Sequence, residues 1–404
     1  MSEQLNNISD ATSRYCTGCA ACLAVCPADA LQYRLNDEGF YEAFVEENKC
    51  IHCGRCRKVC YKFALDEDLG IEFKQGTLYA AQSVRPDIVQ SCTSGGLAYE
   101  IARYCLADGY IVVGVVYDYS THRAKTVLAD SNEGLELLKG SKYLQADSQD
   151  AFQSILKDAV ENPHRKYVVF GTPCQIAGFK KTLTVQRVKN EILTVDLFCH
   201  GVPSYWVWDR YRSKYPSLQN VVFRSKKRGW HNFTLEIGIP EKIYYLTAER
   251  NFFYRIFFDN ILLNKPCFTC KLRSRYSSAD IRLGDFWGKK YQNREDGVSA
   301  CLLLSDKGKE IFQDLVSHGN IRQIAEESIA ECMAFQSNHD YAYWKQREQA
   351  FEELKNGIAL KYVVRKYRKS FPYACRLKQS IKQLISCIPV FMIHHIKVLY
   401  RKCI

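Results

Sequence analysis

Two short runs of cysteine constrain this chain more than any other feature. The first run reads Cys16-Thr-Gly-Cys19-Ala-Ala-Cys22-Leu-Ala-Val-Cys26, and the second has cysteines at 50, 53, 56 and 60. Both have the spacing C-x2-C-x2-C-x3-C. Three thiolates on a tight turn can bind three irons of one iron–sulfur cube, and the fourth points toward the cube of the other run. The two runs therefore predict two [4Fe–4S] clusters.

This exchange of the fourth ligand assigns the cysteines to the clusters. We predict that one cluster is held by Cys16, Cys19, Cys22 and Cys60, and the other by Cys50, Cys53, Cys56 and Cys26. Zinc is the weaker alternative, because it usually takes paired cysteines or histidines. Tyr61 stands where the second run would usually have a proline, which removes no ligand. The spacing is that of bacterial ferredoxins, so residues 11–66 are predicted to form a ferredoxin-like domain. A small hairpin is expected between the runs, and residues 1–10 are expected to be frayed.

Chain length and cysteine content indicate the number of domains and the redox compartment of the protein. With 404 residues the chain has room for two or three domains. Nineteen cysteines would suggest a disulfide scaffold only in a small secreted protein. The start, Met1-Ser-Glu-Gln-Leu, has neither the basic nor the apolar region of a signal peptide. We therefore expect a reducing, cytoplasmic location in which thiols are free to bind metal.

The net charge of +12 is concentrated at one end of the chain. Eleven lysines or arginines and no acidic residue lie from Lys361 onward, which leaves about +1 for the first 360 residues. This distribution argues against a nucleic-acid partner for the folded body. Residues 341–404 are predicted to form a basic helical tail, whose apolar stretch 384–393 is too short to span a bilayer. A cap on the core, a partner contact, an RNA contact and peripheral contact with the inner membrane face all remain open.

The fold class is predicted to be α+β, with a mixed α/β domain at residues 77–340 after the ferredoxin-like domain. Continuous apolar runs predict buried strands at 110–117, 166–171 and 192–198. The last two lead directly into Cys174 and Cys199. Loops at the carboxyl ends of sheet strands bind ligands in α/β folds. These two loops are therefore expected to converge on one site.

Four cysteines outside the two runs offer a further metal site. Cys174 and Cys199 follow strands, and Cys267 and Cys270 form a C-x2-C pair. Four thiolates are enough for a third [4Fe–4S] cluster. The alternative is that all four are inert thiols, and spacing alone does not decide, because discontinuous ligands form no readable motif.

A loop before the predicted helix 97–106 suits a phosphate group. Thr93, Ser94, Gly95 and Gly96 lie at the helix start, where free amides point outward. An ordinary N-cap is the alternative.

Four segments together resemble those of the coenzyme F420 hydrogenase/dehydrogenase beta subunits, a family of iron–sulfur flavoproteins. They are residues 171–178, 196–204, 223–230 and 280–288. The resemblance covers about residues 12–310. Members of the family move electrons between clusters and a bound FAD, which exchanges electrons with a deazaflavin or another organic substrate. Several carry a third cluster, which favours a metal site at Cys174, Cys199, Cys267 and Cys270.

The resemblance also implies FAD in the domain that begins near residue 78. The candidate cofactor-binding residues are Thr93, Ser94, Gly95, Gly96, Thr172, His200, Lys226, Arg228 and Asp285. Alternatives are a solvated loop for the Lys/Arg run and ordinary loop or turn roles for His200 and Asp285. No catalytic acid or nucleophile stands out.

The implied function is an oxidoreductase that acts on a small-molecule substrate. Its ferredoxin-like domain would contact a redox partner protein or a low-potential electron donor. A non-catalytic electron-transfer subunit of a larger redox complex is the main alternative, and an interaction protein with structural clusters is the third.

Overall fold

The computed structural model describes residues 6–9, 16–63, 69–336, 339–342 and 345–367, together with Leu384, Ile388 and Met392. The chain forms two compact units, which are treated separately below. The first unit comprises residues 1–202 and 264–341, and the second comprises residues 203–263 and 342–404. A separate unit that contains residues 203–263 was not predicted from the sequence. The predicted domain boundaries 11–66, 77–340 and 341–404 therefore stay predictions.

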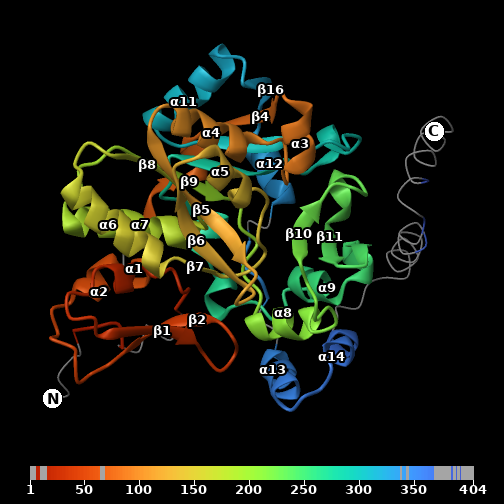
Figure 1. Ribbon diagram of the computed structural model, residues 1–404, viewed down its shortest axis with the longest axis horizontal. Coiled ribbons are helices and arrows are strands. Elements are labelled where there is room, and N and C mark those ends of the chain that lie inside the picture. The colour runs from red at the N-terminus through yellow and green to blue at the C-terminus, as the bar shows by residue number, and fades with distance from the viewer. Residues whose placement is uncertain are drawn as a thin grey trace. The chain divides into compact units, whose positions relative to one another are not determined.

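Residues 16–63, the ferredoxin-like segment, open the first unit. Helices α1 (Ala21–Ala24) and α2 (Arg55–Val59) follow the two cysteine turns, and the short η2 (Tyr61–Phe63) follows Cys60. Strands β1 (Leu31–Leu35) and β2 (Tyr41–Val45) pair antiparallel, which confirms the expected hairpin. In Figure 1 this segment is red, with α1 close to α6 and α7.

A nine-stranded mixed sheet forms the centre of the first unit. In order across the sheet, its strands are β16 (Ile321–Glu327), β4 (Thr77–Ser83), β15 (Ser299–Leu303), β14 (Ile281–Asp285), β9 (Ile192–Leu197), β8 (Lys166–Phe170), β5 (Tyr110–Asp118), β6 (Arg123–Ala129) and β7 (Ala146–Asp147). The predicted buried strands are confirmed as β5, β8 and β9. A small separate ladder pairs β3 (Ile71–Glu72) with β13 (Tyr276–Ser277).

Four neighbouring strands, β14, β9, β8 and β5, run parallel, so their carboxyl ends meet at one edge of the sheet. Apolar side chains such as Val168, Leu193 and Ile281 are fully buried in its core. The helices of this unit beyond the ferredoxin-like segment are α3 (Pro86–Ser91), α4 (Leu97–Ala107), α5 (Asn132–Leu138), α6 (Gln149–Glu161), α7 (Pro173–Gln186), α10 (Lys271–Ser274), α11 (Asp306–Ser317) and α12 (Ile329–Phe335).

The second unit packs a three-stranded antiparallel sheet with short helices. Its elements are α8 (Tyr205–Arg212), β10 (Asn220–Ser225), β11 (Thr234–Ile239), β12 (Lys242–Leu246), α9 (Phe252–Phe258), α13 (Arg347–Lys355) and α14 (Leu360–Tyr367). Its core is aromatic: the rings of Trp208, Phe223 and Phe253 lie 5.1–6.1 Å apart between centroids. Aromatic pairs at this spacing stabilise a core beyond their buried area.

The beginning of the basic tail belongs to this second unit. Helix α14 buries Leu360, Val363, Val364 and Tyr367, and it packs against α8, α9 and α13. Residues 360–367 therefore pack within the second unit. The apolar stretch 384–393 lies almost entirely outside the described residues, so the membrane-contact prediction stays open. No helix among the described residues has both the length and the apolar character needed to cross a bilayer.

Candidate iron–sulfur centres

The first thiol group is Cys16, Cys19, Cys22 and Cys60, and the structure brings its members together. Burial raises the pKa of Cys22, and the nearby Cys16, Cys19 and Cys60 raise it further. Burial likewise raises the pKa of Cys60 to about 11. The amide of Gly18 donates a hydrogen bond to Cys16 Sγ at 3.3 Å. Such a pocket keeps the thiols protonated until iron replaces the protons.

The second thiol group is Cys26, Cys50, Cys53 and Cys56. All four line a single cavity, so the predicted exchange of Cys26 into the second run is geometrically feasible. Burial raises the pKa of Cys56, and the neighbouring thiols of Cys26 and Cys50 raise that pKa further. The amide of Ala30 donates to Cys26 Sγ at 3.4 Å.

Residues 6–9 cover the second thiol group, although residues 1–10 were expected to be frayed. Asn7 is 1% exposed and Ile8 is 6% exposed. Asn7 Nδ2 donates to Cys50 Sγ at 3.7 Å and to Glu47 Oε1 at 3.3 Å. The expectation was wrong for these four residues, because a buried amide bonded to a thiol and a carboxylate holds them in place.

Removing this amide is expected to change one cluster only. Hydrogen bonds to cluster sulfurs stabilise the more negative, reduced state and so raise its potential. We therefore expect Asn7→Ala to lower the reduction potential of the second cluster in a redox titration followed by EPR. Asn6→Ala is the matched control, since Asn6 Nδ2 donates to the exposed carbonyl of His52 instead of to a cysteine sulfur. An unchanged potential in Asn7→Ala would show that Asn7 is only a packing residue.

The third thiol group is Cys174, Cys199, Cys267 and Cys270. Cys174 lies in the first turn of α7, directly after β8, and Cys199 follows the parallel strand β9. Cys267 and Cys270 are separated by Phe268 and Thr269, immediately before α10. The two loops therefore converge as expected from the parallel strands.

Burial and mutual repulsion link the members of this third group. Burial raises the pKa of Cys199 to about 12, with contributions from Cys174 and Cys270. Burial and the neighbouring Cys199 and Cys270 also raise the pKa of Cys267. The backbone amides of Gly201 and Val202 oppose these shifts in Cys199 and Cys267. The group thus combines four neighbouring thiols with backbone amide donors, which is compatible with the predicted metal site.

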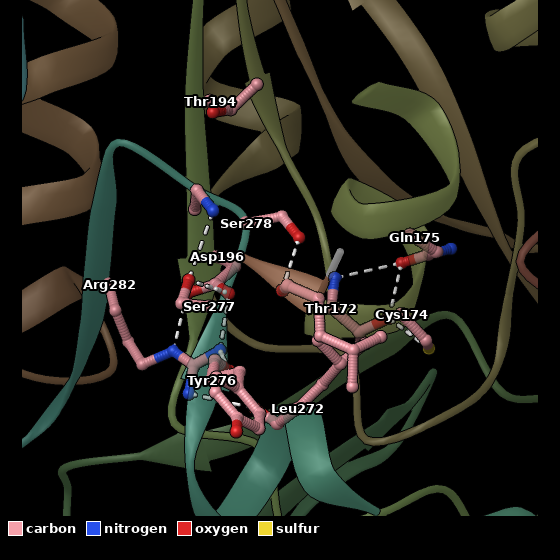
Figure 2. A network of polar contacts seen from close by, with 12 residues as sticks. Thr172, Cys174, Gln175, Thr194, Asp196, Leu272, Tyr276, Ser277, Ser278 and Arg282 are labelled. Atoms are coloured by element: carbon pink, nitrogen blue, oxygen red, sulfur yellow. Dashed lines mark hydrogen bonds and ion pairs between the residues drawn. The ribbon is translucent and has the colours of Figure 1, made fainter. Parts of the chain in front are cut away.

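Polar residues hold Cys174 and its neighbours in place. Thr172 and Gln175 form a capping box at the start of α7, and the Thr172 hydroxyl lies 3.2 Å from Cys174 Sγ (Figure 2). Burial raises the pKa of Cys174 to about 11, and this hydroxyl lowers it. Thr172, predicted as a flavin contact, therefore contacts the third thiol group.

A buried arginine lies beside the same group. Arg273 donates to the carbonyls of Cys267, Phe268 and His339, and its guanidinium lies 3.8 Å from the centre of the Tyr341 ring. The Tyr341 hydroxyl in turn donates to the His200 carbonyl at 2.9 Å. Burial and the neighbouring thiols raise the pKa of Cys199, whereas the positive charge of Arg273 lowers it. His200 is thus placed next to the third thiol group through Cys199, and Arg273 supplies a cation that the sequence analysis missed.

A buried ion pair anchors the segment that carries Cys270. Arg282 of β14 and Asp196 of β9 are both 0% exposed, and Arg282 Nε donates to Asp196 Oδ1 at 2.7 Å. Arg282 also donates to the carbonyls of Leu272 and Tyr276 at 3.0 and 3.4 Å (Figure 2). It therefore ties residues 272–276 to the parallel strands, so that Cys270 lies near Cys174 and Cys199.

Family models match most of the chain. Residues 78–152 and 164–328 match the models for the coenzyme F420 hydrogenase/dehydrogenase beta subunit, N-terminal and C-terminal regions respectively. Together they span more than half of the chain. The chain belongs to the family of coenzyme F420 hydrogenase/dehydrogenase beta subunits. In addition, residues 15–65 match a 4Fe-4S dicluster domain.

Relatives within and around this family share modest identity. An uncharacterized protein of Methanocaldococcus jannaschii is 28% identical over 226 residues, which cover 47% of this chain and 60% of the relative. One subunit of the F(420)H(2) dehydrogenase of Methanosarcina mazei is 28% identical over 197 residues, or 46% of this chain and 53% of the relative. The chain thus spans between half and two thirds of these curated relatives. A chain of the F420-reducing [NiFe] hydrogenase complex from Methanosarcina barkeri is 18% identical, with a TM-score of 0.46, over 74% of this chain and 94% of that chain.

Several of the flavin-binding residues that the family resemblance implies are already hydrogen-bonded within the protein. Ser94 Oγ donates to the Val298 carbonyl at 2.9 Å, and the Gly95 amide donates to Ser299 Oγ at 2.9 Å. Thr93 Oγ1 accepts from the Ser141 amide at 2.9 Å. These groups of the predicted phosphate loop therefore already have partners within the protein. Gly96, with φ of 89°, forms the N-cap of α4, where the first amides point outward.

Of the other predicted flavin contacts, Asp285 lies beside this loop, because Ser94 Oγ also donates to the carbonyl of the preceding residue, Gly284, at 3.4 Å. Asp285 ends β14, and its carbonyl accepts from Gln336 Nε2 at 2.7 Å. Lys226 and Arg228 belong to the second unit, and so their relation to the loop stays a prediction. Lys226 is only 7% exposed, and Arg228 Nη1 donates to the Ile388 carbonyl at 3.0 Å. These contacts argue against a fully solvated loop at Lys226.

Proposed function

We propose that this chain is an iron–sulfur flavoprotein oxidoreductase with three [4Fe–4S] clusters and one FAD, which exchanges electrons with a deazaflavin or another organic substrate. The observation that supports this most strongly is the convergence of Cys174, Cys199, Cys267 and Cys270. Two parallel strands and one buried ion pair hold these four thiols together. Core cysteines that only pack, such as Cys105 and Cys301, have no comparable set of thiol neighbours.

The bound groups would supply the redox chemistry: clusters carry single electrons and a flavin carries two. The chain's own residues bind and orient them. Backbone amides of Gly18, Ala30 and Gly201 donate to the cysteine sulfurs, and burial excludes water from the first and third thiol groups. Arg273 places a positive charge beside the third group, where thiolates and sulfides accumulate negative charge.

The first and third thiol groups approach each other closely at helix α7. Burial raises the pKa of Cys19, and the neighbouring thiols of Cys60 and Cys174 raise it further. A Cβ at Gly178, one turn after Cys174, would lie 3.0 Å from Cys19 Sγ and 2.8 Å from Ala21 Cβ. Only glycine allows this approach without displacement of α7. The contact supports electron exchange between a ferredoxin-type cluster and the larger part of the same unit.

For the flavin phosphates, the first unit offers a cation that the sequence analysis missed. Arg85 Nε pairs with Glu100, in the first turn of α4, at 3.1 Å, and its Nη2 is buried without a hydrogen-bond partner among the described residues. Arg103 also pairs with Glu100, so two cations face one carboxylate there. Arg85 and the first amides of α4 fit a diphosphate better than the already bonded groups of Thr93, Ser94 and Gly95.

This assignment predicts a specific loss of flavin. Arg85→Gln is expected to lower the FAD content at least severalfold, because it removes the cation with the unpartnered nitrogen, and to leave the iron content unchanged. FAD would be measured by absorbance after denaturation and by rebinding to the deflavinated protein. Arg103→Gln removes the other cation paired with Glu100 and is expected to keep its flavin. Equal flavin content in Arg85→Gln and the parent chain would remove Arg85 from the site.

The overall proposal is tested by anaerobic purification followed by reduction with F420H2. We expect about one flavin per chain, and bleaching of both the flavin and the cluster absorbance by the added F420H2. The main alternative is a non-catalytic electron-transfer subunit, which the internal bonding of the Thr93–Gly95 loop favours. About eight irons without flavin, reducible by dithionite alone, would support that alternative. Flavin bleached by dithionite but not by F420H2 would point to another organic substrate.

A further inference from the structure

Tyr61 occupies an unusual position between two thiol groups. It follows Cys60 directly, at the point where the sequence spacing would usually place a proline, and it begins η2. The side chain is 6% exposed, yet its hydroxyl has no hydrogen-bond partner among the described residues. A buried hydroxyl without a hydrogen-bond partner costs free energy unless a bound group accepts its hydrogen bond. A proline or a phenylalanine would avoid this cost.

The surroundings of the ring place it at the third thiol group. Tyr61 packs in an apolar cluster with Ala177, Leu272 and Tyr276, and Cys174 and Cys270 pack against that cluster. Ala177 lies on α7 one turn after Cys174, and Leu272 lies two residues after Cys270. The ring therefore fills the space between the two peptide segments that carry these cysteines.

Electrostatic contacts agree with this placement. After burial, the causes that raise the pKa of Tyr61 are Cys270, Cys174 and Cys19, in that order. The Thr17 side chain also lies close and lowers the pKa, but it does not reach hydrogen-bond geometry with the hydroxyl. Two of the three neighbouring sulfurs thus belong to the third thiol group and one to the first.

We propose that the Tyr61 hydroxyl donates a hydrogen bond to a sulfur at the Cys270 side of the third cluster and thereby favours the reduced state of that cluster. This inference rests on the third cluster of the proposed function. At neutral pH a phenol keeps its proton and acts as a donor. A hydrogen bond to cluster sulfur stabilises the extra negative charge of the reduced state, so it raises the reduction potential. Tyr61 is then a positioning residue that sets how electrons are shared between the first and third clusters.

Tyr61→Phe tests this directly, because it removes the hydroxyl and keeps the ring. Removing a hydrogen bond to a charged acceptor is expected to lower the reduced-to-oxidised ratio of the third cluster roughly tenfold at fixed potential. For a one-electron couple this equals a shift of about 59 mV. Iron content is expected to stay at the parent level. The measurement is a redox titration followed by EPR on anaerobically purified full-length chain, with the third-cluster signal assigned by its loss in Cys267→Ala.

The matched control is Tyr276→Phe, which removes a hydroxyl from the same apolar cluster and is expected to leave all three potentials unchanged. An unchanged third-cluster potential in Tyr61→Phe, with full iron content, would overturn the inference. A shift confined to the first cluster would overturn it too, since the bond would then go to Cys19. If the parent chain and Cys267→Ala hold the same iron and give the same signals, the third cluster itself is absent, and the proposed function fails on that point together with the inference.

Discussion

Cys267→Ala is expected to remove about four of roughly twelve irons per chain, because each cubane holds four. Cys267 is one of four thiols in the third thiol group, and its pKa is raised by burial and by Cys199 and Cys270. Alanine offers no ligand atom, so the three remaining thiolates would leave one iron of the cube without a protein ligand. Iron and acid-labile sulfide are counted after anaerobic purification. The EPR signals of the two clusters in the ferredoxin-like segment are expected to remain.

Cys105→Ala is the matched control for this result. Cys105 is fully buried in the core of the first unit, on α4. Its replacement is expected to leave the iron content unchanged. If Cys267→Ala retains the same iron as the parent chain, the third thiol group holds no cluster. If both variants lose iron equally, the loss reflects unfolding and not ligation.

Arg282→Met is expected to be the most destabilising single substitution in the first unit. It leaves the carboxylate of Asp196 buried without its cation, which costs about 3–5 kcal/mol. It also removes the donors to the carbonyls of Leu272 and Tyr276 that hold the Cys270 segment. We therefore expect a lower midpoint of urea unfolding and, in whatever folded protein is recovered, a deficit of about four irons.

Arg294→Met provides the comparison for this ion pair. Arg294 pairs with Asp296 at 2.7 Å, but the two side chains are 33% and 45% exposed. A solvent-screened pair of this kind contributes about 0–1 kcal/mol. Similar unfolding midpoints in Arg282→Met and Arg294→Met would contradict the anchoring role of the Arg282–Asp196 pair.

The sequence predicted those parts of the site that depend on regular spacing. The two cysteine runs predicted both ligand sets of the ferredoxin-like segment, and the cavity lined by Cys26, Cys50, Cys53 and Cys56 is compatible with the exchanged fourth ligand. Apolar runs located β8 and β9. Since parallel strands end at the same edge of a sheet, they also predicted that Cys174 and Cys199 would converge.

Residues that act through tertiary contacts were not readable from the sequence. Arg282 is the second residue of β14, between Ile281 and Leu283, and only the neighbouring β9 shows that Asp196 is its partner. Tyr61 could be noticed as a departure from proline, but its unpaired hydroxyl and its thiol neighbours required the fold. Arg85 stands before Pro86 in a segment without a recognisable motif, so the sequence did not indicate it as a phosphate-binding residue.

The division into two units was also hidden from sequence reasoning. Residues 203–263 and 342–404 are separated by about eighty residues of the first unit. No composition shift or linker marks the points where the chain leaves and re-enters. Helix α9 ends at Phe258, within the aromatic run 252–263. Asn260 follows in the left-handed region, with φ of 59°, a conformation that commonly ends a helix.

Metal analysis of the anaerobically purified full-length chain tests the central claim most directly. Three thiol groups of four cysteines each predict about twelve irons and twelve sulfides per chain, with a brown protein whose absorbance falls on reduction. Zinc in place of iron, in a colourless protein, would contradict the account as a whole.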